Sequence, residues 1–181
     1  MNVSVTDRFK VEHATELYGL EGWSNGYFAI QPDGHLAVTP HRDASRAVDL
    51  YEIVTRLKAD GIPTPVLLRF PQVVVSQVER LTGAFGAAIE EYAYPNRYAP
   101  VFPIKVNQQR AVVEALLSGG RRFGMGLEVG SRPELLVAAA LPLSDEALIV
   151  CNGFKDKEYL ASATLATRLG RRVVVVIEKP F

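Results

Sequence analysis

The sequence predicts an α/β fold in which helices cover a parallel sheet, and three observations support this. Short runs of apolar and β-branched residues alternate with longer segments whose apolar residues recur at helical spacing. From the second run onward the unit repeats about every 23 to 26 residues, which is typical of a (β/α) barrel or a doubly wound sheet. A complete eight-stranded barrel takes about 250 residues. The chain has 181 residues and ends on an apolar run, so we expect the front part of a larger protein.

Composition and charge narrow the class of protein. Lysine plus arginine and aspartate plus glutamate each number 20, and 48% of residues are hydrophobic. That balance excludes a disordered chain and disfavours binding to nucleic acid or to a membrane surface. No apolar run approaches the roughly 18 residues of a membrane helix, and residues 1–8 lack the features of a secretory signal. The single cysteine, Cys151, excludes a disulfide framework, so we expect a cytoplasmic protein.

Residues 1–62 predict a small β-hairpin followed by a helix. Two apolar runs flank Pro32-Asp33-Gly34, a turn in which glycine suits a positive φ. The expected strands are residues 27–30 and 35–38. Asp43 or Ser45 can cap a helix that ends near residue 60, because Gly61 and Pro63 follow.

Residues 63–181 predict an incomplete barrel of about five strands. Each apolar run is followed by a segment with helical periodicity, except the last. The expected strands are residues 66–70, 100–106, 126–129, 147–151 and 172–177. The expected helices are residues 74–92, residues 109–117, a helix beginning at Ser131, and residues 156–169.

Lys105 is the strongest candidate for chemistry because it lies within the apolar run of residues 101–106. Side chains alternate along a strand, so Lys105 would lie on the face opposite Ile104 and Val106. Barrel enzymes carry their chemistry at the carboxyl ends of the strands, where an inward lysine offers a nucleophilic amine. The alternative is a lysine at a strand end whose amine simply reaches solvent.

Other polar side chains come at the ends of the next two strands. Glu128 could face the same interior as Lys105, or it could be a solvated charge at the strand end. Asn152 follows the next strand and could also face a site there. Ser131 and Glu134 match an S-x-x-E capping box, which is a structural role. The three histidines show no metal-ligand spacing, so we expect no metal site.

Several motifs, in order along the chain, resemble those of the biosynthetic arginine decarboxylases. Residues 102–108, Phe-Pro-Ile-Lys-Val-Asn-Gln, resemble the cofactor-lysine motif of that family. The other matching segments are residues 23–38, 68–72, 126–131 with Glu134, 150–156 and 176–179. The lysine motif alone would indicate only the wider group of barrel-type pyridoxal-phosphate decarboxylases and alanine racemase-like enzymes. The whole set indicates the narrower family.

The resemblance implies a pyridoxal 5′-phosphate (PLP) enzyme whose N-terminal part is a (β/α)8 TIM-like barrel, with a later β domain. Lys105 would bind the cofactor covalently, and Glu128, Asn107 and Asn152 would lie beside it. The substrate would be L-arginine and the products agmatine and carbon dioxide, in polyamine (putrescine and spermidine) biosynthesis. The resemblance allows Mg²⁺ as well, although the sequence shows no ligands for it. It also implies a dimer-based homo-oligomer for the full-length enzyme.

Three alternatives stay open at this point. The same chemistry could act on ornithine or diaminopimelate, because the residues that select the substrate are expected outside this chain. The chain could belong to a non-catalytic relative that binds and regulates a decarboxylase, or to an unrelated α/β binding domain. The phosphate loop and the acid that pairs with the pyridine nitrogen are also expected elsewhere. We therefore expect the 181-residue chain alone to be inactive.

Overall fold

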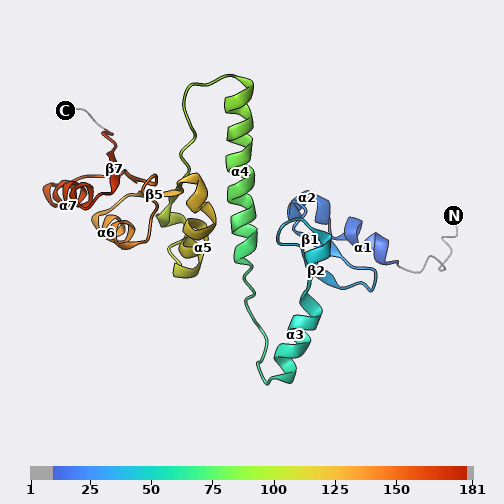
Figure 1. The fold of residues 1–181 in the computed structure, drawn as a ribbon. Helices are drawn as coiled ribbons and strands as arrows, with labels where there is room; N and C mark the ends of the chain where they lie inside the picture. The colour runs from blue at the N-terminus through green and yellow to red at the C-terminus, as the bar shows by residue number, and fades with distance from the viewer. Residues whose placement is uncertain (1–9, 179–181) are drawn as a thin grey trace, which may run out of the picture. The chain divides into compact units, whose positions relative to one another are not determined.

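The structure is a computed structural model that describes residues 10–178 (Figure 1). It divides into two compact units, Met1–Val73 and Val74–Phe181. The sequence predicted a boundary between two domains after residue 62, and that domain boundary stays a prediction. Within residues 10–178, no helix combines the length and the apolar character that a bilayer crossing requires.

The first unit contains a three-stranded antiparallel sheet of order β1-β2-β3. Its elements are α1 Val11–Leu17, α2 Leu20–Ser24, β1 Phe28–Ile30, β2 Leu36–Val38, β3 Val48–Asp49 and α3 Leu50–Ala59. Phe28 pairs with Val38 and Ile30 with Leu36. Gly34 has a φ of +88° between them, a value that glycine adopts without steric cost. The predicted hairpin is therefore confirmed.

Helix α3 begins later than the sequence predicts. Asp43 caps only a short 3₁₀ turn, accepting a hydrogen bond from the Ser45 N–H at 2.9 Å. Val48 and Asp49 form strand β3 and pair with β2, so a helix cannot include them. The cap of α3 is Asp49, whose Oδ1 accepts from the Glu52 N–H at 2.9 Å. The start predicted at Asp43 or Ser45 is wrong, whereas the predicted end is confirmed.

The second unit is a four-stranded parallel sheet of order β4-β5-β6-β7 with helices packed on it (Figure 1). Its strands are β4 Val101–Pro103, β5 Gly126–Val129, β6 Leu148–Cys151 and β7 Arg172–Val175. Its helices are α4 Pro71–Glu91, which begins within the first unit, α5 Arg110–Gly120, α6 Arg132–Ala140 and α7 Lys157–Arg168. One row of paired residues crosses the sheet from Phe102 through Leu127 and Ile149 to Val173.

The core of this unit lies around the central strands. All four residues of β5 are buried, so this strand is covered on both faces. Leu127, Val129, Leu135 and Ile149 are fully buried. Burying a side chain of this size stabilises the fold by about 1.5–3 kcal/mol. The core fixes the strand ends that carry the candidate site.

Two strand predictions are wrong. Residues 66–70 form no strand and lie directly before Pro71, which begins α4. The strand expected at residues 100–106 ends at Pro103, because proline has no N–H with which to continue a ladder. Lys105 therefore lies in a 3₁₀ turn, Ile104–Val106, and the strand alternation used to orient it does not apply. The fold class itself, a parallel sheet covered by helices, is confirmed.

Candidate functional site

Three of the four residues predicted from the sequence line one open hollow of about 530 Å³. Lys105 follows β4, Glu128 lies within β5, and Asn152 follows β6. Because neighbouring strands are parallel, their carboxyl ends meet at one edge of the sheet. Three segments far apart in sequence therefore contribute to one site.

Glu128 is a buried carboxylate. It is 7% exposed and alternates with Leu127 and Val129, which face the apolar core. Its Oε1 accepts a hydrogen bond from Asn152 Nδ2 at 2.9 Å. The alternative interpretation, a solvated charge at a strand end, is therefore wrong. A carboxylate that is buried to this extent needs polar partners, and the Asn152 amide is one of them.

Asn152 is held by backbone and side-chain contacts. Its N–H donates to the Val129 carbonyl at 2.8 Å. The buried Tyr159 hydroxyl lies 3.1 Å from the Val129 carbonyl oxygen and 3.4 Å from that of Asn152. Burial raises the pKa of Tyr159 far above its usual range, so the phenol stays protonated and can donate. Tyr159 thereby positions the backbone that carries Asn152.

Lys105 also lines this hollow. Its side chain is exposed, which differs from the buried strand position expected. Across the part of the chain that the structure describes, the Lys105 amine has no hydrogen bond or ion pair. It is therefore available to an incoming group.

Asn107 does not line this hollow. Its Oδ1 accepts from the Gln109 N–H at 3.0 Å, in the turn just before α5. The structure thus gives Asn107 a local role in that turn. Its contact with a cofactor stays a prediction.

Two further carboxylates in the hollow were not identified from the sequence as site residues. Glu134 Oε2 accepts from the Gly130 N–H at 2.7 Å, and Glu178 Oε1 accepts from the Gly153 N–H at 2.6 Å. Gly153 has a φ of +75°, and a Cβ there would overlap the carbonyl oxygen of Gly130. The two glycines therefore form one tightly packed rim.

The capping box expected at α6 is half formed. Ser131 Oγ accepts from the Glu134 N–H at 3.5 Å, but the Glu134 carboxylate reaches the N–H of Gly130 instead of that of the cap. The S-x-x-E pattern of Ser131 and Glu134 was the one feature of the sequence that could have pointed to Glu134 at this rim. Glu178 stood in the last resembling segment, whose Lys179 lies outside the described residues.

The donor set of the hollow fits the aldehyde end of a pyridoxal cofactor. A primary amine for the aldehyde, a buried carboxylate and an amide lie around one space. The phosphate end does not fit equally well. Three carboxylates and a single amine line the hollow, and such a balance repels a dianion. The described residues of this hollow therefore suit one end of the cofactor.

A second group of possible ligands lies in the first unit. Side-chain atoms of Asp33, His35 and Asp49 lie within 4.8 Å of one another, although the sequence spacing had suggested no metal site. His35 Nδ1 is 2.7 Å from Asp49 Oδ2, and this contact raises the pKa of His35 above its usual range. His35 lies within ion-pair distance of both Asp33 and Asp49. Because Asp49 also caps α3, these contacts connect the hairpin to that helix.

Comparisons with known proteins identify one family. The family described as pyridoxal-dependent decarboxylase, pyridoxal binding domain, matches residues 75–177. The biosynthetic arginine decarboxylase of Parasynechococcus marenigrum is 44% identical over 180 residues, which cover 99% of this chain and 28% of the relative. That of Bacteroides thetaiotaomicron is 43% identical over 172 residues, which cover 95% and 27%.

A solved structure extends the comparison to the fold. The biosynthetic arginine decarboxylase of Campylobacter jejuni superposes with a TM-score of 0.81 at 35% identity, covering 89% of this chain and 26% of that one. The likeness confirms the predicted fold class. The chain spans about a quarter of the length of the relatives it matches.

Proposed function

Because this chain belongs to the pyridoxal-dependent decarboxylase family, we propose that it supplies the lysine side of the cofactor site in a cytoplasmic PLP enzyme. The reaction is decarboxylation of L-arginine to agmatine and carbon dioxide, a step of polyamine biosynthesis. One observation carries the proposal. The unpaired amine of Lys105 and the buried carboxylate of Glu128 line the same hollow at the carboxyl ends of parallel strands.

Lys105 is the covalent attachment point in this proposal. Bound PLP supplies a ring that accepts the electron pair released when a carboxylate leaves as carbon dioxide. Lys105 contributes a primary amine on a flexible stem, free of competing partners among the described residues. Its position in a turn after β4 lets the amine approach the hollow from the strand end.

Glu128 contributes a fixed negative charge. Asn152 holds its Oε1 at 2.9 Å, which sets the orientation of the carboxylate. A buried carboxylate interacts more strongly with a cation than an exposed one does, because the local dielectric is low. Glu128 is therefore suited to hold a protonated amine or another cationic group of the cofactor or the substrate.

Arginine as the substrate is supported by the names of the relatives, each a biosynthetic arginine decarboxylase. Ornithine and diaminopimelate are the competing substrates. The Asn107 contact with the cofactor and a dimer-based assembly belong to the same proposal.

A chimeric enzyme tests the function. Residues 10–178 would replace the matching segment of the Parasynechococcus marenigrum relative, and amine products would be measured from arginine, ornithine and diaminopimelate. We expect agmatine, and we expect Lys105→Ala to abolish it while Lys157→Ala, at an exposed position on α7, does not. Agmatine formation by a folded Lys105→Ala chimera would reject the assignment. Turnover of ornithine in preference to arginine would reject the substrate.

A further inference from the structure

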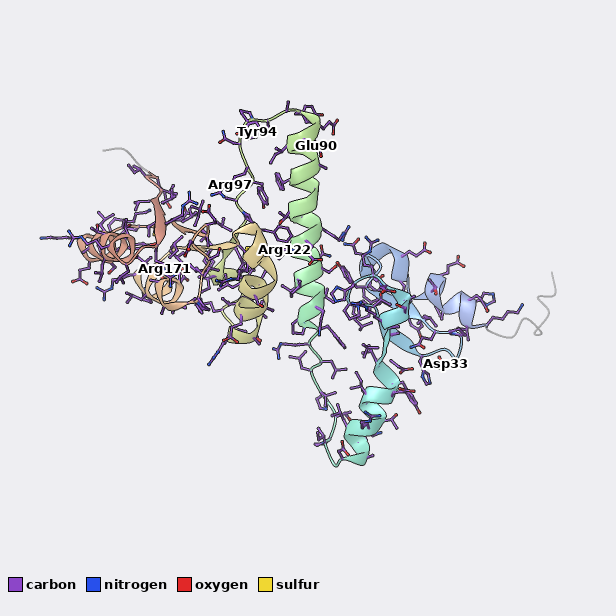
Figure 2. All side chains as sticks on the ribbon, viewed as in Figure 1. Asp33, Glu90, Tyr94, Arg97, Arg122 and Arg171 are labelled. Atoms are coloured by element: carbon purple, nitrogen blue, oxygen red, sulfur yellow. The ribbon has the colours of Figure 1, made fainter. Side chains whose placement is uncertain are left out.

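One histidine and two aspartates of the first unit bring their side chains together. Asp33, labelled in Figure 2, and His35 belong to the connection between β1 and β2, and Asp49 ends β3 and caps α3. His35 Nδ1 lies 2.7 Å from Asp49 Oδ2 and 3.5 Å from Asp33 Oδ2. One ligand atom of each residue lies within 4.8 Å of the other two. We refer to these three residues as the hairpin cluster.

The spacing of these atoms suits a single divalent metal ion. Zn²⁺ binds imidazole nitrogen and carboxylate oxygen at about 2.0–2.2 Å, so two ligands at a tetrahedral angle lie about 3.3 Å apart. The distance of 3.5 Å between His35 Nδ1 and Asp33 Oδ2 is close to this value. The distance of 2.7 Å between His35 Nδ1 and Asp49 Oδ2 is that of a hydrogen bond. It would widen to a ligand spacing once the proton between the two atoms leaves.

Each of the three side chains is positioned through atoms that a metal does not need. Asp33 Oδ1 accepts a hydrogen bond from the His35 N–H at 3.0 Å, and Asp49 Oδ1 accepts from the Glu52 N–H at 2.9 Å. In both carboxylates Oδ2 is the oxygen near the imidazole. The His35 ring packs against Tyr51, with ring centroids 4.5 Å apart. Metal ligands are typically oriented in this way by a surrounding set of contacts.

The hairpin cluster is open to an ion from solvent. The side chains of Asp33 and His35 are 56% and 31% exposed. The Gln31 side-chain amide lies 3.5 Å from Asp49 Oδ2, and its oxygen can become a further ligand when the amide turns over. Two carboxylates balance the charge of a divalent ion. The imidazole favours Zn²⁺ and Co²⁺ over Mg²⁺ and Ca²⁺, which prefer sites made of oxygen alone.

We propose that the hairpin cluster binds a divalent transition-metal ion of the Zn²⁺ type through Asp33 Oδ2, His35 Nδ1 and Asp49 Oδ2. The ion takes the place of the proton between His35 and Asp49, which passes to solvent. Water or the Gln31 amide completes the coordination. Because Asp49 caps α3 and the other two ligands belong to the hairpin, the ion fastens that helix to the hairpin. The site does not depend on the Lys105 hollow or on the proposed decarboxylase function.

Titration of the 181-residue chain with Co²⁺ tests the proposal, because the visible absorption of Co²⁺ reports its ligands directly. We expect a saturable visible band at one ion per chain. Zn²⁺ should abolish the band by competition, whereas an excess of Mg²⁺ should not. We also expect Zn²⁺ to raise the unfolding midpoint, because an ion that binds the folded state stabilises it.

Two variants locate the ion. Asp49→Asn keeps an oxygen that can cap α3 but removes the anionic ligand, and we expect it to weaken Co²⁺ binding more than about tenfold. His35→Gln should weaken binding at least as much. The matched controls are His41→Gln, at an exposed histidine, and Asp43→Asn, at the aspartate that caps the short 3₁₀ turn. Both controls should keep the wild-type band and affinity.

Two results would overturn the proposal. One is a wild-type chain that gives no saturable Co²⁺ band at millimolar metal. The other is a band that His35→Gln and Asp49→Asn leave unchanged, because the ion would then lie elsewhere on the chain. Should either variant fail to fold, Asp33→Asn supplies the same comparison, since it removes a ligand at an exposed turn position and leaves the cap of α3 intact.

Discussion

Two hollows at opposite ends of the four-stranded sheet are lined by side chains of opposite charge. At the carboxyl end, Glu128, Glu134 and Glu178 line the hollow. At the amino end, Arg97, Arg121 and Arg122 line a second hollow together with Glu146. The same strands connect both ends, so the difference arises from the segments that flank each strand.

Helix direction explains only part of this separation, because α5, α6 and α7 also begin with the basic residues Arg110, Arg132 and Lys157. In a βα unit each helix begins at the carboxyl end of its strand and ends at the amino end of the sheet. Helix N-termini favour acidic groups and C-termini favour basic groups. Asp156 caps α7, and Glu134 lies in the first turn of α6. Arg121 follows α5.

Among the residues that line the hollow at the carboxyl end, Lys105 is the exception to the acidic character. It is the cation among three carboxylates, and no described residue engages its amine. The carboxylates meanwhile hold Asn152, Gly130 and Gly153 in place. A lysine amine left without a partner, where the neighbouring acids are engaged, is available to a ligand.

The largest effect should come from breaking the glycine rim at the carboxyl end. Gly153→Ala places a methyl group on the Gly130 carbonyl and forces alanine to a φ of +75°. We expect a loss of about 3 kcal/mol in the free energy of unfolding. The matched control is Gly170→Ala, whose φ is +86° but whose Cβ meets nothing within 4 Å; it should cost about 1 kcal/mol.

Urea unfolding of both alanine variants measures the contrast. Equal losses in the two would mean that backbone strain alone acts and that the rim is not tightly packed.

A smaller effect should come from the amino end, where Arg171 satisfies the last carbonyls of α6 (Figure 2). Its Nη2 donates to the carbonyls of Ala139 at 3.0 Å and Leu141 at 2.9 Å. Arg171→Ala should cost about 2 kcal/mol, because it leaves part-buried carbonyls unpaired. Arg168→Ala, which removes an exposed guanidinium from α7, should change stability by less than about 0.5 kcal/mol. A loss equal to that of Arg168→Ala would contradict the capping role.

The smallest effect concerns pH at Glu146. The Arg97 guanidinium, with Arg172 nearby, lowers the pKa of Glu146 below its usual range. A carboxyl with a lower pKa in the folded state stabilises that state above its unfolded pKa, near 4.3, and the gain disappears as pH falls through the folded pKa. The unfolding midpoint of wild type minus that of Glu146→Gln should therefore be constant above about pH 5 and shrink below it.

Scanning calorimetry between neutral and acidic pH measures this difference. The pair is exposed, so added salt should reduce the effect. A difference that grows on acidification would contradict the sign of the shift.

The sequence predicted those parts of the fold that local patterns determine. Helical periodicity indicated α4, and the helix predicted from residue 156 is α7, which Asp156 caps. Strand β5 was predicted with its observed bounds, Gly126–Val129. Residues 66–70 were predicted as a strand but form none. Their apolar composition does not reveal whether a neighbouring strand is present to pair with them.

The site was predicted less completely because its geometry depends on contacts between segments far apart in sequence. Motif resemblance pointed to Lys105, Glu128 and Asn152, which share the hollow. It did not reveal that Pro103 ends β4 and places Lys105 in a turn. Nor could spacing along the chain show that Glu178 reaches Gly153, 25 residues away.

Covalent trapping of PLP on this chain tests the central claim most directly, which is that Lys105 is the reactive amine of the hollow. The 181-residue chain is incubated with PLP, reduced with borohydride and mapped by peptide mass spectrometry. We expect the pyridoxyl label on Lys105 in clear excess over Lys155 and the exposed Lys157, and we expect Glu128→Gln to reduce that excess. A label spread evenly over these lysines, or concentrated on Lys155, would contradict the account.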